Sequence, residues 1–385
     1  MIDTIPVRPD ERFAVDRVAA FLCQSGLTQF EPSHLEVEQF PAGQSNLTYL
    51  LRSGTWEAVL RRPPLGPVAP RAHDMAREFH ILQRLHPSFP LAPKPFVLCD
   101  DREVIGAPFY VMERRRGLVL DMKLPADWSP DPALHQAIAE SVVRVLVDLH
   151  AVDWQAAGLG EISHPEGYME RQVKGWLDRL ARARTEDIAE ITTLADWLVE
   201  HLPESPPPTV IHNDYKLNNL RLDGSDPSRV TAVLDWEMST VGDPLSDVAS
   251  LLVYWTAPGE DDLMGGLKSV TAEPGFPPRA QIRELYAKLS GRDVTQLDFY
   301  IAFAYFKLGV IIQQIYYRWY KGQTHDERFA RHGGVATNLI RYAAHIAGLT
   351  ESESNFSGSG ALPRSAARRA ERAALPLTRI TLDPD

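Results

Sequence analysis

Short runs of alternating hydrophobic and polar residues dominate the first third of the chain. Residues 35–40 alternate, residues 47–51 are apolar, and residues 56–61 form a third run. A period of two with turn residues between the runs is typical of antiparallel strands. The next apolar residues recur at helical spacing and predict a helix over 71–85, and residues 109–113 predict a buried strand that leads into a connector.

Helical spacing dominates the remainder of the sequence. Apolar residues recur every three or four positions over 134–149, and residues 170–186 predict a further helix. The longest apolar stretch, residues 299–315, is too short to span a bilayer comfortably, so we expect a buried helix there. The Ser/Gly-rich and then basic residues 351–385 predict a flexible tail.

Polar residues in the segment 210–247 point to phosphoryl transfer. This chemistry needs a group that orients the acceptor hydroxyl and oxygen ligands that hold magnesium against the triphosphate. Asp214 suits the first task, and Asn219 and Asp235 suit the second. Asp214 and Asn219 are spaced as in the protein-kinase pattern H-R-D-L-x-x-x-N, where the counterpart of His212 braces the loop. Each residue alone is an ordinary turn former, but the whole set favours a kinase-type site.

Three short apolar or β-branched runs surround these residues, at 209–211, 220–222 and 230–234. They predict that the base and the amide ligand lie on a loop between strands and that the carboxylate ligand lies at a strand end. Catalytic groups are commonly carried in this way.

The upstream sequence offers groups for a nucleotide. The turn after the first predicted strand contains Gly43, Ser45 and Asn46, which offer backbone, hydroxyl and amide donors to a phosphate, although one glycine is a weak signal. Arg61 ends the third strand where the protein-kinase pattern V-A-I-K has lysine, and Arg62 is the alternative cation.

Glu78 lies beside the apolar stripe of the following predicted helix, where an ion-pair partner for the strand cation would sit. A solvated helix charge is the alternative interpretation.

The order of these motifs resembles the aminoglycoside phosphotransferase and choline kinase superfamily, and within it the kinase-like domains fused to acyl-CoA dehydrogenases. The likeness covers roughly residues 30–347. The segments that carry it are residues 43–48, 59–64, 109–113, 149–153, 234–237, 242–247 and 322–324.

The resemblance implies a bilobal, protein-kinase-like α+β fold. Residues 1–113 would form a nucleotide-binding lobe with an antiparallel sheet, a helix and an N-terminal helical extension, and residues 114–350 a mostly helical lobe for catalysis and the acceptor. Met112 and Glu113 would lie in the hinge, whose backbone pairs with a purine edge.

The resemblance also assigns roles to the site residues. Asp247 would brace the catalytic loop, and Asp243 would share that structural work. Asn213 stands where many aminoglycoside kinases have glycine, but this departure removes no metal ligand. The remaining family roles carry over as catalytic base for Asp214, metal ligands for Asn219 and Asp235, and a phosphate-side ion pair for Arg61 and Glu78.

Composition supports a soluble enzyme, and the low number of cysteines leads us to expect a reducing cytoplasm. The 385 residues carry a net charge of −11, which argues against a nucleic-acid partner. Only Cys23 and Cys99 are present, so neither a disulfide framework nor a cysteine-based zinc site is expected. The acidic start of the chain has no signal-peptide pattern, and we expect no membrane insertion.

We therefore expect a Mg²⁺-dependent kinase that uses ATP, with GTP left open, and acts on a small-molecule hydroxyl. The resemblance favours a hydroxyacyl-CoA, whose phosphates would need cations such as those at 114–116 or 171–184; both clusters are otherwise solvated faces. An aminoglycoside, macrolide or choline-like acceptor would instead need carboxylates, such as those at 260–262 in a long loop. A non-catalytic nucleotide-binding scaffold is the alternative of another class.

Overall fold

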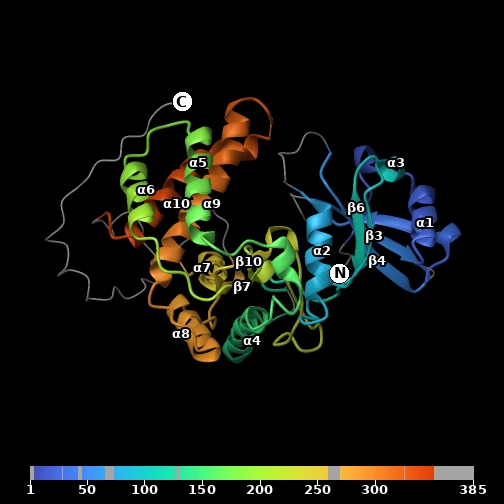
Figure 1. Ribbon diagram of the computed structural model, residues 1–385, viewed down its shortest axis with the longest axis horizontal. Helices are drawn as coiled ribbons and strands as arrows, with labels where there is room; N and C mark the ends of the chain where they lie inside the picture. The colour runs from blue at the N-terminus through green and yellow to red at the C-terminus, as the bar shows by residue number, and fades with distance from the viewer. Residues whose placement is uncertain are drawn as a thin grey trace.

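The computed structural model describes residues 4–27, 29–41, 46–65, 73–125, 128, 131–258, 269–324 and 326–350. Gly43 and Ser45, the acidic residues 260–262 and the tail 351–385 lie outside these ranges, so the expectations about them stay predictions. Figure 1 shows a sheet-containing lobe beside a larger helical lobe, which confirms the bilobal α+β fold.

The small lobe is built on a six-stranded antiparallel sheet with the strand order β1-β2-β3-β4-β6-β5. Its strands are β1 (Ile5–Pro6), β2 (Glu36–Gln39), β3 (Leu47–Ser53), β4 (Trp56–Arg62), β5 (Pro95–Cys99) and β6 (Phe109–Glu113). The helices α1 (Val15–Gln24) and α3 (Arg102–Ile105) lie on one side of the sheet, and α2 (Met75–Leu85) lies on the side that faces the large lobe (Figure 1).

The alternation of side chains along the strands separates two hydrophobic cores. Leu60 and Val111 pack with α1 in one core, whereas Val59, Tyr110 and Met112 pack with α2 in the other. The second core continues into the large lobe, so hydrophobic packing crosses the boundary predicted between residues 113 and 114.

Two expectations for this lobe need correction. The described sheet has six strands, whereas the sequence predicted three plus the run at 109–113. The two strands that were not predicted have weak sequence patterns: β1 has only two residues, and β5 begins with a proline and contains a register shift. The helix expected from residue 71 begins at Met75, because the Asp74 side chain accepts a hydrogen bond from the Arg77 backbone N–H at 2.9 Å and caps it.

The large lobe is mostly helical, with two short hairpin-like sheets that carry the motif residues. One sheet pairs β7 (Thr209–Ile211) with β10 (Thr240–Gly242), and the other pairs β8 (Leu220–Leu222) with β9 (Val230–Val233). Its helices are α4 (Pro132–His150), α5 (Tyr168–Ala183), α6 (Glu190–Glu200), α7 (Pro244–Tyr254), α8 (Arg279–Ser290), α9 (Leu297–Tyr320) and α10 (His332–Ile346).

The apolar helix α9 is longer than its sequence pattern predicted. With 24 residues it has the length and composition to cross a membrane, so the expectation that it is too short was wrong. It nevertheless packs in the core, with Phe306 and Val310 buried. Gly309 lets α10 approach closely, since a Cβ there would lie 2.9 Å from the Cγ1 of Ile340.

Candidate active site

A buried carboxylate holds the loop that follows β7. Asp247, in the first turn of α7, accepts the backbone N–H groups of His212 and Asn213, each at 2.6 Å. The Nε2 atom of His150 lies 3.4 Å from the same carboxylate, and its Nδ1 atom lies 2.8 Å from the Tyr286 hydroxyl. Burial lowers the pKa of His150, so a neutral imidazole donates to Asp247 and accepts from Tyr286.

Asn213 turns the chain toward the candidate base. Its φ of 66° is in the left-handed region, where asparagine is tolerated better than most residues and glycine best. Its side chain accepts from the Tyr168 hydroxyl at 2.6 Å and donates to the Met238 carbonyl at 3.0 Å. This backbone conformation explains why asparagine can replace glycine at this position.

The next residue, Asp214, lies within reach of an amide and a cation. The Asn219 side-chain nitrogen donates to the Asp214 carboxylate at 3.1 Å and to its backbone carbonyl at 2.9 Å, so the amide oxygen is the atom that Asn219 can offer a cation. The Lys216 ammonium lies 2.9 Å from the same carboxylate and 4.8 Å from the Tyr254 ring. Burial opposes the charge of Lys216, but Asp214 and Tyr254 outweigh it and raise the pKa of Lys216.

Lys216 was not among the predicted site residues. The signal was available, because Lys216 stands two residues after Asp214, inside the motif used to find the base.

Asp235 follows β9 and is tied to the catalytic loop through the backbone of Leu234. The Leu234 N–H donates to the Asn219 carbonyl at 2.8 Å, and the Leu234 carbonyl lies 2.9 Å from the Nε2 atom of His212. His212 is fully buried, which suits the bracing position predicted for it. These contacts bring together motif residues that follow β7 and β9, which belong to two separate two-stranded sheets.

One arginine joins the two lobes across the site. Arg61, at the end of β4, donates to Glu78 of α2 at 2.8 Å and to Asp235 at 2.9 Å, and lies 3.5 Å from Glu237. Burial disfavours the charge on this guanidinium, but Glu78 and the other acids raise the pKa of Arg61. The Arg62 side chain is also buried, and among the described residues it makes no ion pair.

The carboxylates around this arginine differ in their environment. Burial raises the pKa of Glu78 to about 7, although Arg61 opposes that rise. Burial also acts to raise the pKa of Asp235, but its two interactions with Arg61 outweigh burial, and the pKa falls below its usual value. The lowered pKa favours the ionised carboxylate of Asp235, the form that binding a cation would require.

Asn46 connects the small-lobe loop to the same segment. Its side-chain nitrogen donates to Glu237 at 2.7 Å, and its oxygen lies 2.9 Å from the Nδ1 atom of His73. Arg77 of α2 donates to the carbonyls of Glu237 and Ser239. The sequence predicted a site role for Asn46 but none for Glu237 or His73.

The predicted hinge residues lie at the end of β6. Met112 is buried and pairs with Val59 of β4. The Glu113 N–H donates to the Lys94 carbonyl at 2.8 Å, so this N–H group is already used in a hydrogen bond within the small lobe.

Asp243 caps the N-terminus of α7 and links that helix to α9 through the Tyr300 hydroxyl. It accepts from the Leu245 N–H at 3.0 Å and from the Tyr300 hydroxyl at 2.5 Å, and burial raises its pKa.

A family model described as the phosphotransferase enzyme family matches residues 36–283 of this chain, more than half of its length. The chain belongs to the phosphotransferase enzyme family. This match confirms the resemblance inferred from the motifs and spans the catalytic loop, Asp235 and the Arg61–Glu78 pair.

Two relatives combine such a region with other sequence. The chain is 34% identical over 333 residues to acyl-CoA dehydrogenase family member 11 of Rattus norvegicus and 33% identical over 344 residues to family member 10 of Mus musculus. These alignments cover 84% and 89% of this chain but only 42% and 32% of the relatives, so the chain spans about two fifths or less of their length.

Solved structures share the fold. A candidate aminoglycoside phosphotransferase from Ralstonia eutropha is 33% identical, with a TM-score of 0.75 over 89% of this chain and all of that chain. Choline kinase from Cryptosporidium parvum is 14% identical, with a TM-score of 0.54 over 86% of this chain and 98% of that chain, and shows a shared fold alone.

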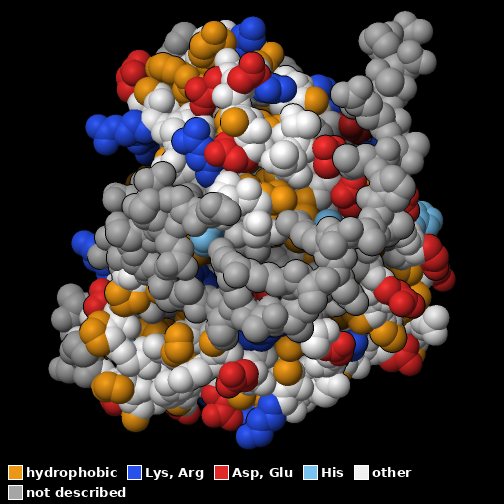
Figure 2. Space-filling view, turned by 90° about the vertical axis from the view of Figure 1, so that its left-hand side faces the viewer, with side chains coloured by type: hydrophobic (Ala, Val, Ile, Leu, Met, Phe, Trp, Pro, Cys, Tyr) orange, Lys and Arg blue, Asp and Glu red, His pale blue; other side chains and the backbone are white. Residues whose placement is uncertain are grey.

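The basic clusters of this phosphotransferase are largely engaged by the protein itself. Arg114 and Arg116 both pair with Glu57, and Arg171 donates to the carbonyls of His164 and Glu166. On the large-lobe face in Figure 2, basic side chains are interspersed with acidic ones. The segment 114–116 is therefore not a preformed set of cations that awaits a ligand, whereas in the segment 171–184 Arg179 contacts the Trp176 ring and has no ion pair among the described residues.

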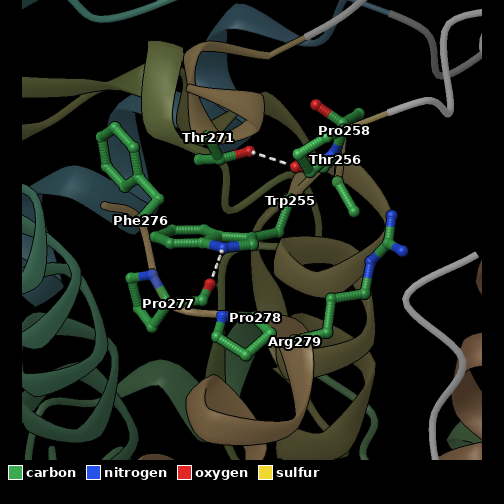
Figure 3. Close-up of a pocket in the computed structure, with 9 residues that line it drawn as sticks. Trp255, Thr256, Pro258, Thr271, Phe276, Pro277, Pro278 and Arg279 are labelled. Atoms are coloured by element: carbon green, nitrogen blue, oxygen red, sulfur yellow. Dashed lines mark hydrogen bonds between the residues drawn. The ribbon is translucent and has the colours of Figure 1, made fainter. Parts of the chain in front are cut away.

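An apolar pocket of about 320 Å³ opens beyond the C-terminal end of α7. Its lining includes Trp255, Pro258, Phe276 and Arg279, and Figure 3 shows the indole ring between Phe276 and Pro278. None of the predicted site residues lines it. Its first lining residue, Trp255, directly follows Tyr254, whose ring lies 4.8 Å from the Lys216 ammonium.

Proposed function

We propose that this protein transfers the γ-phosphoryl group of a magnesium-bound nucleotide to a hydroxyl group of a small molecule. The observation that carries the proposal is the convergence of Asp214, Asn219 and Asp235 opposite the Arg61–Glu78 ion pair. Phosphoryl transfer depends on positioning and on charge stabilisation, and this arrangement has groups for both.

The donor set fits magnesium. The amide oxygen of Asn219 and the ionised carboxylate of Asp235 are hard oxygen ligands, and magnesium usually keeps several waters beside such ligands. When bound, the metal would neutralise charge on the phosphate oxygens. Arg61 would pair with phosphate oxygens from the small lobe, since a guanidinium binds them through two parallel N–H groups.

Asp214 would orient the acceptor hydroxyl and accept its proton. Lys216 lies 2.9 Å from this carboxylate, where its positive charge can face the transferred phosphoryl group. Asp247 would act through the loop backbone and is a positioning residue.

For the substrates, we propose ATP as donor, in the cytoplasm, and a hydroxyacyl-CoA as acceptor. The names of the relatives, both acyl-CoA dehydrogenase family members, support an acyl-CoA acceptor. The apolar pocket beyond α7 supports a ligand with a hydrocarbon part. ATP is the default over GTP, because both would be read mainly by hinge backbone.

Phosphate transfer across a panel of hydroxyacyl-CoAs, amino alcohols and aminoglycosides tests the proposal. Wild type should show magnesium-dependent transfer to a hydroxyacyl-CoA, and Asp214→Asn should lower kcat by about 10²–10⁴-fold, the usual contribution of a general base. Asp178→Asn, on the exposed face of α5, is the matched control and should behave as wild type. Transfer only to an antibiotic would overturn the CoA assignment; no transfer to any acceptor would favour the scaffold alternative.

A further inference from the structure

Helices α5 and α9 each place a cation at the Trp176 ring, and one of the two reaches the loop that follows β7. The Lys307 ammonium of α9 lies 3.4 Å from the backbone carbonyl of Asn213 and 5.7 Å from the ring of Trp176. The Arg179 guanidinium lies 4.6 Å from the same ring. It folds back along α5 over Gly175, where a Cβ would come within 3.1 Å of its Nη1 atom.

Neither cation has an acidic partner at ion-pair distance within the described parts of the chain. This distinguishes them from Arg114 and Arg116, which share Glu57. Tryptophan attracts cations through its ring face, but that attraction does not remove the repulsion between two positive charges.

The electrostatic surroundings of Lys307 show the same imbalance. Burial lowers the pKa of Lys307; Asp214 and Asp247 oppose this shift, whereas Arg179 and Lys216 add to it. The positive charges of Lys307, Arg179 and Lys216 therefore lie near two carboxylates. One of these, Asp247, already accepts two backbone N–H groups. An anion beside Lys307 would balance these charges.

We propose that Lys307 and Arg179 bind a negatively charged group of the acceptor, so that the enzyme selects anionic over cationic hydroxyl compounds. This inference rests on the proposed phosphotransferase function and assigns its acceptor a charge. The group is a carboxylate or a phosphate, either of which can accept charge-assisted hydrogen bonds from an ammonium and a guanidinium. An ammonium on an aminoglycoside or choline would be repelled from the same place.

Kinetics with matched acceptors test the inference. Lys307→Met removes the charge and keeps much of the side-chain length, and Lys288→Met, an exposed lysine of α8, is the control. Each variant is assayed with a hydroxyacyl-CoA against the corresponding neutral hydroxyacyl-pantetheine, and with a hydroxy acid against its neutral amide. These two pairs distinguish a phosphate from a carboxylate.

We expect Lys307→Met to raise KM for at least one anionic acceptor by about tenfold or more, the loss typical of one hydrogen bond to a charged group. KM for its neutral counterpart and for the nucleotide should change less than about twofold, and Lys307→Arg should retain most of the affinity. Equal changes for the charged and neutral members of both pairs would overturn the inference.

Calorimetric titration with coenzyme A and with the hydroxy acid gives a readout that needs no turnover. Wild type and Lys288→Met should bind at least one of these anions, and Lys307→Met and Arg179→Gln should bind it at least tenfold more weakly. Equal binding by all four proteins, or no binding by wild type, contradicts the anion site. Absence of phosphate transfer while these binding differences persist would instead contradict the proposed function.

Discussion

Replacing Asp247 with asparagine should separate the support of the catalytic loop from its chemistry. Asp247 is fully buried, and each of its oxygens accepts a backbone N–H at 2.6 Å. Asparagine keeps one acceptor oxygen but turns an amide nitrogen toward the second N–H. One charge-assisted hydrogen bond is lost, and one buried donor is left without an acceptor.

The two losses set the magnitude. A hydrogen bond to a charged group contributes roughly 1.5–3 kcal/mol, and an unsatisfied buried donor costs roughly 1–3 kcal/mol. We therefore expect Asp247→Asn to lower the free energy of unfolding by about 2.5–6 kcal/mol, which a domain in the middle of the usual range of roughly 5–15 kcal/mol survives. Because the affected N–H groups belong to His212 and Asn213, kcat should also fall while KM for the nucleotide changes little.

Urea unfolding and steady-state kinetics measure the two effects on one preparation. Asp178→Asn makes the same chemical change at an exposed position and should shift the free energy of unfolding by less than about 0.5 kcal/mol. If Asp247→Asn loses less than about 1 kcal/mol and retains wild-type kcat, the carboxylate does not hold the loop and the reasoning is refuted.

Three further predictions concern the metal ligand, a titrating acid and a close packing contact. Asp235→Ala should weaken magnesium-nucleotide binding more than Asp214→Asn does, and equal losses by calorimetry would contradict their separate roles. Because burial raises the pKa of Glu78 to about 7, the contribution of Glu78 to the free energy of unfolding is present below pH 4.5 and is lost as the pH rises through about 7. Over the same pH range kcat/KM for the nucleotide should rise, because the ionised carboxylate binds Arg61. A pH profile that is unchanged in Glu78→Gln would exclude Glu78 as the titrating group. Gly242→Ala would place a Cβ 2.7 Å from the Cδ1 of Ile211 and 3.0 Å from the Tyr168 ring. Thermal melts should therefore show that the free energy of unfolding falls by about 1–3 kcal/mol.

The sequence was sufficient for the elements whose pattern is local. Strands β3, β4 and β6 follow from short runs bounded by turn residues, and their expected ends agree with the structure to within two residues. Strand β10 was not predicted, because its three residues include a glycine and gain their stability from pairing with β7, about thirty residues earlier in the chain.

Spacing likewise revealed Asp214 and Asn219 because the chemistry fixes their separation along one loop. The partners of Arg61 were harder to predict. Glu78 was found through helical order, but Glu237 lies 176 residues from Arg61 in sequence and acquires its contact only when the lobes pack together.

Charge density in the sequence is an incomplete guide to the proposed acceptor-binding cations, because the cluster 171–184 contains Arg179 but neither cluster contains Lys307. In the dense basic segment 114–116 the arginines have acidic partners in the fold: Glu57 pairs with Arg114 and Arg116, and Glu113 pairs with Arg115. A cation held for a ligand must lack such a partner, because a resident carboxylate would compete with the incoming anion. Lys307 and Arg179 both meet this condition among the described residues, and the place of Lys307 in an apolar helix, far from any basic cluster, made it inconspicuous in the sequence.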